Sequence, residues 1–272
     1  MFEVLCFIAG IGAGLFGSLA GVGGGLVIVP LLTVVLGVDI RHAIGASLLG
    51  VIAVSTAATA SYLQSGLVDR RLGLTLLLAT ATGGIVGGYV GGLLDPTVLS
   101  GIFGVVLLLV AVQMLRGRRS VPVELVGEPV GLEFDSSYVE PTTGAEVTYR
   151  ARRVGLGTAV SLAAGALSGL LGIGGGVVNV PTMHLIMGVP IRVALTTSTF
   201  MLGATAAASA VIYYSRGLVD PLLAAPVVVG VFIGARAGAR LSHRLPQHTL
   251  QLLFVGVSLI FAAQMLLRAA GR

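Results

Sequence analysis

The sequence has few charged residues and no lysine. Only 10% of its 272 residues are charged and 56% are hydrophobic, with a mean hydropathy of +1.03. Soluble domains carry about 25% charged residues to cover their surface, so this composition excludes an ordinary soluble protein. All 16 basic residues are arginines, which lie between apolar runs rather than along one face. This spacing is typical of the signals that orient membrane helices, and it argues against nucleic-acid binding despite the basic pI.

Cysteine and carboxylates inside apolar segments are also missing. The only cysteine, Cys6, can form no intramolecular disulfide and no thiolate metal cluster. Six of the eleven acids fall within residues 117–153. The other five lie at segment ends: Glu3, Asp39, Asp69, Asp95 and Asp220. Because cation transporters and proton relays place carboxylates inside the membrane, this pattern favours an anionic or neutral solute.

The chain contains one unit twice. A shift of 151 residues lays the GVGGG of residues 21–25 on the GIGGG of 172–176, and the GLVD of 66–69 on the same letters at 217–220. No insertion is needed between these matches, which composition alone would not produce. The predicted organisation follows from this duplication. It comprises a first transmembrane repeat at 1–116, a polar loop at 117–153 and a second transmembrane repeat at 154–272.

Each repeat predicts five apolar segments. They lie at about 4–20, 25–38, 43–64, 72–94 and 97–115, and again at 155–171, 176–189, 194–215, 222–245 and 248–267. The last three of each set reach the ~20 residues that cross a bilayer as helices. The first two are too long together for one crossing, so they predict a hairpin broken at its glycines. Such a hairpin returns the chain to the side where it started. Three further crossings then leave the chain on the opposite side, so the second copy is inverted. The fold class is therefore an all-α integral membrane protein of two inverted repeats, each a Gly-broken hairpin plus three transmembrane helices.

The arginines agree with this topology without selecting it. Apart from Arg236, which lies inside a segment, they divide 11 to 4 between the two sides, which places the central loop in the cytoplasm of a plasma-membrane protein. If the first two segments of each repeat formed one crossing, the arginines would also divide 11 to 4. Segment length, not charge, therefore decides between the two topologies. Alternating residues at 121–126 and 146–149 predict a small β-hairpin in the central loop. A solvated linker is the simpler role for that loop, and a regulatory site is the alternative.

The glycine runs are the strongest functional candidates. A dinucleotide fingerprint needs a preceding strand and a βαβ unit, whereas this run joins two predicted apolar helices in both copies, so it is not such a fingerprint. Three adjacent glycines break an apolar helix, and the amides freed at its start attract anions at mid-depth. A tight turn with close packing is the structural alternative. The substrate-binding glycines are Gly23, Gly24, Gly25, Gly174, Gly175 and Gly176.

At these glycines the chain resembles the TauE/SafE sulfite exporter family. The resemblance rests on Gly21 to Pro30, on the echo from Gly172 to Pro181 and on the duplicated plan, and it covers the chain except 117–153. It implies a multi-pass exporter of small anions, typically sulfite, sulfoacetate or related organosulfur compounds. It does not define the substrate, because members of the family serve different solutes. The polar insert departs from the leanest family pattern, which leaves its role open.

Polar side chains near the breaks complete the predicted substrate site. Asn179 lies one turn past the second glycine run, where the first copy has an isoleucine. Thr197 and Ser198 open a later segment of the second copy, and Ser47 matches Ser198 in the first. Hydroxyls in membrane helices also bond their own backbone, which is the alternative for these residues.

Three ionisable residues are candidates for auxiliary roles. His184 lies inside the second broken hairpin, where it could relay a proton, and hydrogen-bonded packing is the alternative. Arg41 and Arg192 are paired at the hairpin mouths, where they could attract anions or set topology.

The sequence favours a secondary transporter with alternating access, and a channel-like permease is the near variant. A membrane-embedded redox subunit is a weaker alternative, because only one of four histidines is deep in a segment. The predicted partners are a small anion and the lipid bilayer, with no cofactor and no metal. Glycines recurring every four residues at 83–91 and 230–238 predict close packing, within the chain or across a homodimer.

Overall fold

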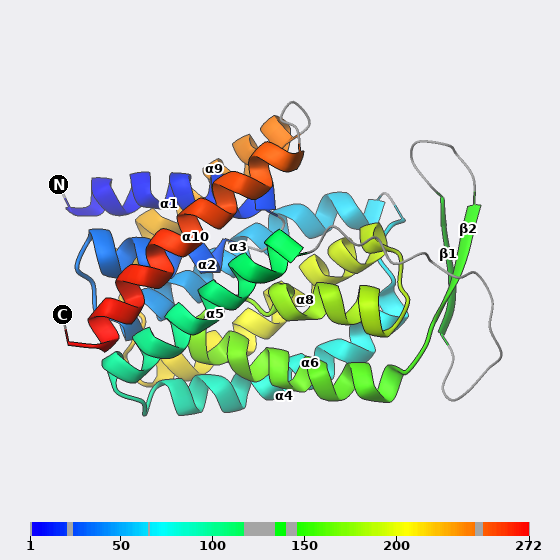
Figure 1. Ribbon diagram of the computed structural model, residues 1–272, viewed down its shortest axis with the longest axis horizontal. Coiled ribbons are helices and arrows are strands. Elements are labelled where there is room, and N and C mark those ends of the chain that lie inside the picture. The colour runs from blue at the N-terminus through cyan, green and yellow to red at the C-terminus, as the bar shows by residue number, and fades with distance from the viewer. Residues whose placement is uncertain are drawn as a thin grey trace.

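The computed structural model describes residues 2–20, 24–64, 66–116, 134–139, 146–242 and 247–271. These residues form a bundle of helices along one long axis, with two strands at one end (Figure 1). The first repeat holds α1 (Phe2–Ala20), α2 (Gly25–Pro30), η1 (Leu31–Val35), α3 (Ile40–Gln64), α4 (Arg70–Gly91) and α5 (Pro96–Arg116). The second holds α6 (Val154–Leu171), α7 (Gly176–Pro181), η2 (Thr182–Ile186), α8 (Ile191–Ser215), α9 (Pro221–Ser242) and α10 (Gln247–Ala269). The bounds of the helices fall close to those predicted from the apolar segments.

The second segment of each repeat differs from the prediction. The predicted helices at 25–38 and 176–189 change into wider π-helical turns, η1 and η2, directly after Pro30 and Pro181. A proline inside a helix has no amide hydrogen, and its ring collides with the carbonyl one turn earlier. The turn that follows each proline is wider than an α-helical turn, and both segments end before their predicted limits.

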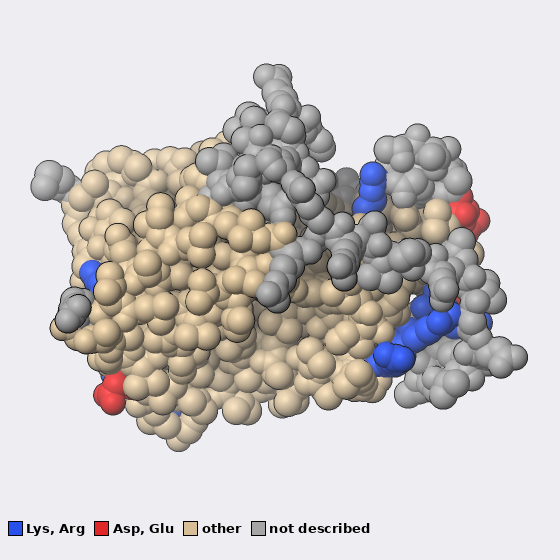
Figure 2. All heavy atoms as spheres, viewed as in Figure 1, with Lys and Arg blue, Asp and Glu red and all other residues tan. Residues whose placement is uncertain are grey.

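The bundle has the dimensions and surface of a membrane protein. Within the described residues, six helices are long and apolar enough to cross a bilayer, and shorter apolar helices lie at Phe2–Gly17, Gly25–Val35, Gly176–Ile186 and Val255–Ala269. The face in Figure 2 shows charged side chains at the two ends of the long axis, and the broad surface between them is uncharged where it is described. The predicted class, an all-α integral membrane protein, is confirmed.

The helices of the two repeats exchange partners across the bundle. Helix α1 packs on α9 and α6 packs on α4, which are corresponding pairs, while α3 packs on α8 and α5 on α10. The last pair is antiparallel, because Gly101 lies beside Ala269 and Gly104 beside Leu266. Both chain ends lie at one end of the bundle, opposite the strands (Figure 1).

The glycine stripes pack inside the chain. A Cβ added at Gly83 would collide with the Leu162 carbonyl oxygen of α6, and one at Gly87 with that of Ala166. The neighbouring Gly84 faces Ser209 of α8. The second-copy glycines contact α1, where Gly230 meets Phe7. These glycines therefore pack against helices of the same chain, and the homodimer stays a prediction.

Replacing Gly87 by alanine is expected to destabilise the bundle. The new methyl group would lie 2.8 Å from Ala166 Cα, so α4 and α6 would have to separate. Overpacking of this kind costs about 1–3 kcal/mol. Gly12→Ala is the matched control, because a Cβ there meets nothing within 4 Å. Thermal unfolding in detergent should show a lower melting temperature for Gly87→Ala alone, and equal melting temperatures would contradict this packing.

The central loop contains a β-hairpin, but its first strand is not the predicted one. Strand β1 (Phe134–Val139) pairs antiparallel with β2 (Glu146–Ala151). The predicted strand residues 146–149 lie in β2, whereas 121–126 lie outside the described residues. Arg150 binds the Asp135 carboxylate through Nε at 2.5 Å and Nη2 at 3.1 Å. This hydrogen-bonded pair lowers the pKa of the exposed Asp135 carboxyl.

Candidate functional site

The two glycine runs break their helices at matched places. Gly24 has φ 79° and Gly175 has φ 75°, left-handed values that glycine adopts without steric cost, and α2 and α7 begin at the next residue. An added Cβ at Gly24 would lie 3.7 Å from Ala13 O, and one at Gly175 would lie 3.4 Å from Ala164 O. Those alanines are about 15 Å along α1 and α6, so both breaks lie near mid-depth. Gly23 lies outside the described residues.

The two breaks contact each other at the centre of the bundle. A Cβ added at Gly25 would collide with Gly172 O and would lie 2.9 Å from Ile173 Cα. Ser47 of α3 donates a hydrogen bond from Oγ to Gly172 O at 2.8 Å. The first copy therefore supports the second break, and the Ser47 hydroxyl is engaged with backbone.

Three polar side chains without hydrogen-bond partners surround the second break. Ser168 Oγ, Asn179 Oδ1 and Ser198 Oγ are buried and unpaired, and their residues are at most 1% exposed. An added Cβ at Gly175 would lie 3.4 Å from Ser168 Cβ and 3.6 Å from Asn179 Nδ2. One at Gly176 would lie 3.4 Å from Ser198 Oγ. Helices α6, α7 and α8 thus place three side chains with unpaired oxygens around Gly175 and Gly176, and we call these side chains the polar cluster.

A fourth unpaired group, a serine hydroxyl, extends the polar cluster along α6. Ser161 Oγ is also buried without a partner, two turns before Ser168 on the same side of the helix. It lies between Gly157, which packs on Met187, and Ala164, which packs on Gly175. The unpaired groups therefore run from mid-depth toward the end of the bundle where η2 ends.

The polar cluster belongs to one repeat. The first copy has Gly10 and Gly17 where the second has Ser161 and Ser168, and Ile28 where it has Asn179. The difference between the copies predicted Asn179, whereas neither serine of α6 was predicted, because no motif marks them. The signal that could have found them is the same difference between aligned copies.

Thr197 lies beside the polar cluster but has a partner of its own. Its hydroxyl accepts a hydrogen bond from the Asp69 backbone N–H at 3.0 Å. Asp69 closes the turn between α3 and α4, where its side chain caps α4 by accepting from Leu72 N at 3.0 Å. Thr197 therefore links α8 to this turn. Its neighbour Ser198 keeps a free hydroxyl.

His184 lies in η2 and is half-buried. Its Nδ1 is 2.9 Å from Val189 O. A carbonyl oxygen can only accept, so Nδ1 carries the hydrogen and Nε2 is left for any proton relay. The hydrogen-bonded packing role is present, and the relay stays a prediction.

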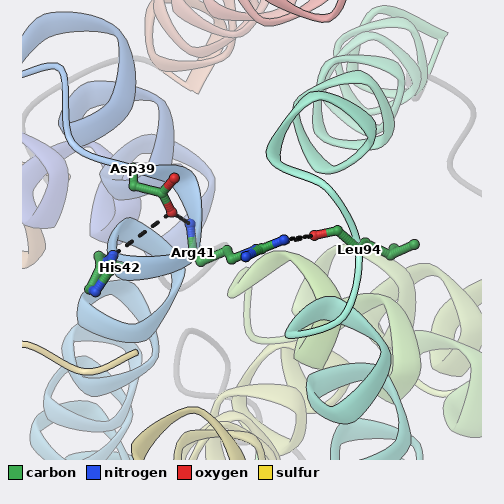
Figure 3. A network of polar contacts seen from close by, with 4 residues as sticks. All are labelled: Asp39, Arg41, His42 and Leu94. Carbon is green, nitrogen blue, oxygen red and sulfur yellow. Dashed lines mark hydrogen bonds and ion pairs between the residues drawn. The ribbon is translucent and has the colours of Figure 1, made fainter. Parts of the chain in front are cut away.

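The two predicted anion-attracting arginines have different settings. Arg41 donates from Nε at 3.1 Å and from Nη2 at 2.6 Å to Leu94 O, which ties α3 to the turn after α4 (Figure 3). Its backbone N–H donates to Asp39 Oδ1 at 2.9 Å, and His42 Nδ1 is 3.8 Å from the same oxygen (Figure 3). Arg192 is exposed near the start of α8. Neither side chain belongs to the polar cluster.

Membrane-spanning helices around buried polar groups define a multi-pass membrane protein, and comparison with known proteins gives its family. The model of the family "Sulfite exporter TauE/SafE" matches residues 6–265. The chain therefore belongs to the TauE/SafE sulfite exporter family and is a membrane transporter rather than an enzyme.

Individual relatives agree with this family. The chain is 30% identical to "Probable membrane transporter protein YunE" of Bacillus subtilis (strain 168), over 97% of each chain. It is also 30% identical to a "Probable membrane transporter protein" of Xylella fastidiosa (strain 9a5c), over 84% of this chain and 80% of the relative. No solved structure gives a significant match.

Proposed function

We propose that the protein is a secondary transporter that exports small anions such as sulfite or organosulfur compounds. The substrate binds at the polar cluster beside the second helix break, and the bundle alternates its access to the two sides. The observation that carries this proposal is that three buried side chains, each with an unpaired oxygen, lie against Gly175 and Gly176.

Unpaired polar atoms in a membrane protein indicate a missing partner. Each buried polar group without a hydrogen bond costs about 1–3 kcal/mol, and lipid supplies no water to satisfy it. Hydroxyls of Ser168 and Ser198 can donate to an oxyanion, and the Asn179 amide can present its N–H by rotation. The first amides of the helix at Gly176–Ile186 add partial positive charge. These groups fit a small oxyanion held without a metal.

The distribution of acidic residues favours an anion over a cation. Among the described residues, every carboxylate lies outside the helix interiors. Glu3 is in the first turn of α1, and Asp69 precedes α4. A carboxylate side chain in the site would repel an anionic substrate. Most cation carriers need such a carboxylate within the membrane, so its absence from the described helix interiors favours an anion.

Opposite insertion of the two repeats would let the site open to either side. Three observations support this proposal: corresponding helices exchange partners, α5 and α10 are antiparallel, and the two breaks touch. The site is occluded, since its side chains are at most 1% exposed. Occlusion suits a carrier that rearranges in each cycle better than a channel with a continuous water path.

We also propose that the protein lies in the plasma membrane, and that the end of the bundle with the β-hairpin faces the cytoplasm. Most described arginines lie at that end, in the first residues of α4, just before α6 and near the start of α8. These are Arg70, Arg71, Arg150, Arg152, Arg153 and Arg192. The opposite end has Arg41, Arg216 and Arg268. The excess of basic residues marks the cytoplasmic side.

Flux into liposomes tests the proposal. Purified protein should move labelled sulfite, or a small sulfonate, faster than protein-free liposomes do, with sulfate and thiosulfate measured in parallel. Competition by the unlabelled anion should slow this flux, because a carrier site saturates. Reconstituted, folded protein that moves none of these anions would contradict the proposal. A visible chromophore in the purified protein would instead favour the redox alternative.

A further inference from the structure

The β-hairpin docks on the transporter through an apolar core. The Tyr138 and Tyr149 rings pack edge to face with centroids 6.3 Å apart, and both side chains are buried. They belong to one apolar cluster with residues of α4, η2 and α8. Its members include Leu72, Met183, Met187 and Met201. The β-hairpin therefore shares an apolar core with the helices that lie between it and the proposed substrate site.

One buried hydrogen bond fastens this hairpin to the turn between α3 and α4. Tyr149 donates from its hydroxyl to Asp69 Oδ2 at 2.7 Å. Burial raises the pKa of the Tyr149 hydroxyl, so it stays protonated and keeps donating at neutral pH. Asp69 is only 6% exposed, whereas its second-copy counterpart Asp220 is exposed. The contact thus distinguishes the two ends of the bundle.

The same contact leads directly to the substrate site. Asp69 donates its backbone N–H to Thr197 Oγ1, and the next residue, Ser198, is a member of the polar cluster. Ser198 is about 10 Å along α8 from the hairpin end. The strand end is also tied to η2, because Arg152 N donates to Met187 O at 2.9 Å. The hairpin therefore holds together the α3–α4 turn, α8 and η2, and these elements separate the site from that end.

We propose that strands β1 and β2 form a gate, and that the Tyr149–Asp69 hydrogen bond is the latch that keeps the site closed from the side of these strands. This inference rests on the proposed function, since it assigns a gate to the same site. Opening toward that side separates the three elements that the hairpin joins, so the latch has to break in every cycle. The opposite end opens without breaking it.

Access to a cysteine placed at the site tests the latch. In a Cys6→Ser background, Ser198→Cys is labelled in detergent by a soluble maleimide. Adding Tyr149→Phe keeps the ring and removes only the hydroxyl, so the hairpin core stays packed. Labelling is expected to become about tenfold faster, which is the order of the loss of one hydrogen bond to a carboxylate. Asp69→Asn, which can still cap α4, should give an intermediate rate.

The matched control changes the same hairpin without touching the latch. Thr148 is the exposed neighbour of Tyr149 in β2 and pairs with Ser137 across the strands. Thr148→Ala leaves the Tyr149 hydroxyl and Asp69 in place, so it should label at nearly the rate of the parent. Equal rates for Tyr149→Phe and Thr148→Ala would overturn the gate. Labelling needs no transport, so a chain that moves no anion would refute the proposed function while the labelling rates still decide the gate.

Discussion

Replacing Asn179 by leucine is expected to abolish anion flux and to raise the melting temperature of the purified protein. Asn179 Oδ1 is buried without a partner beside the second break. Removing an unsatisfied buried amide recovers about 1–3 kcal/mol of stability. The matched position of the first copy holds Ile28, a buried apolar side chain next to an equivalent break. The fold therefore accommodates a large apolar side chain at this position. Anion flux should fall about tenfold for each 1.4 kcal/mol of substrate-binding free energy that is lost.

Ser209→Ala is the control with the opposite expectation. Ser209 is a buried serine of α8, like Ser198, but its hydroxyl donates to Gly84 O at 3.0 Å and lies 3.1 Å from Thr205 O. Losing these bonds should lower the melting temperature and leave flux intact. Liposome flux and thermal unfolding, measured on both variants, separate a binding group from a structural one. An Asn179→Leu protein that transports normally, or that melts earlier than the parent, would remove the polar cluster from the mechanism.

The helices and their breaks were predictable because both depend on local sequence. Apolar length sets the spanning helices, and adjacent glycines such as Gly174 and Gly175 break them wherever the chain folds. The proline after each break was visible in the sequence. Its effect, a π-helical turn after Pro30 and Pro181, was not predicted from segment length.

The rest of the candidate site depends on packing that no single segment records. A serine in an apolar helix usually bonds its own backbone, so Ser161 and Ser168 gave no signal until α7 was placed beside α6. Ser47 was predicted as a substrate contact, yet the approach of the two breaks gives its hydroxyl a backbone partner, Gly172 O. The burial of Asp69 depends equally on a hairpin about 80 residues away, which apolar periodicity does not place.

Gly25→Ala is expected to destroy both folding and transport, whereas Gly176→Ala at the matched position is expected to fold. At Gly25 the new methyl group would collide with Gly172 O and crowd Ile173 Cα at 2.9 Å, and backbone atoms cannot rotate away. At Gly176 the nearest atoms are Leu202 Cδ2 and Ser198 Oγ, both at the ordinary contact distance of 3.4 Å. Overpacking at the first position should cost about 1–3 kcal/mol or more.

This contrast tests whether the two breaks work as one unit. The repeats have the same glycine at corresponding positions, so a role in turn geometry alone predicts similar effects of alanine in both. Contact between the breaks predicts a large loss of thermal stability and flux for Gly25→Ala. It predicts a stable Gly176→Ala protein whose flux is reduced only by the methyl group beside Ser198. Equal melting temperatures for the two variants would mean that the breaks do not press on each other. Substrate movement at the second break would then need no matching movement in the first.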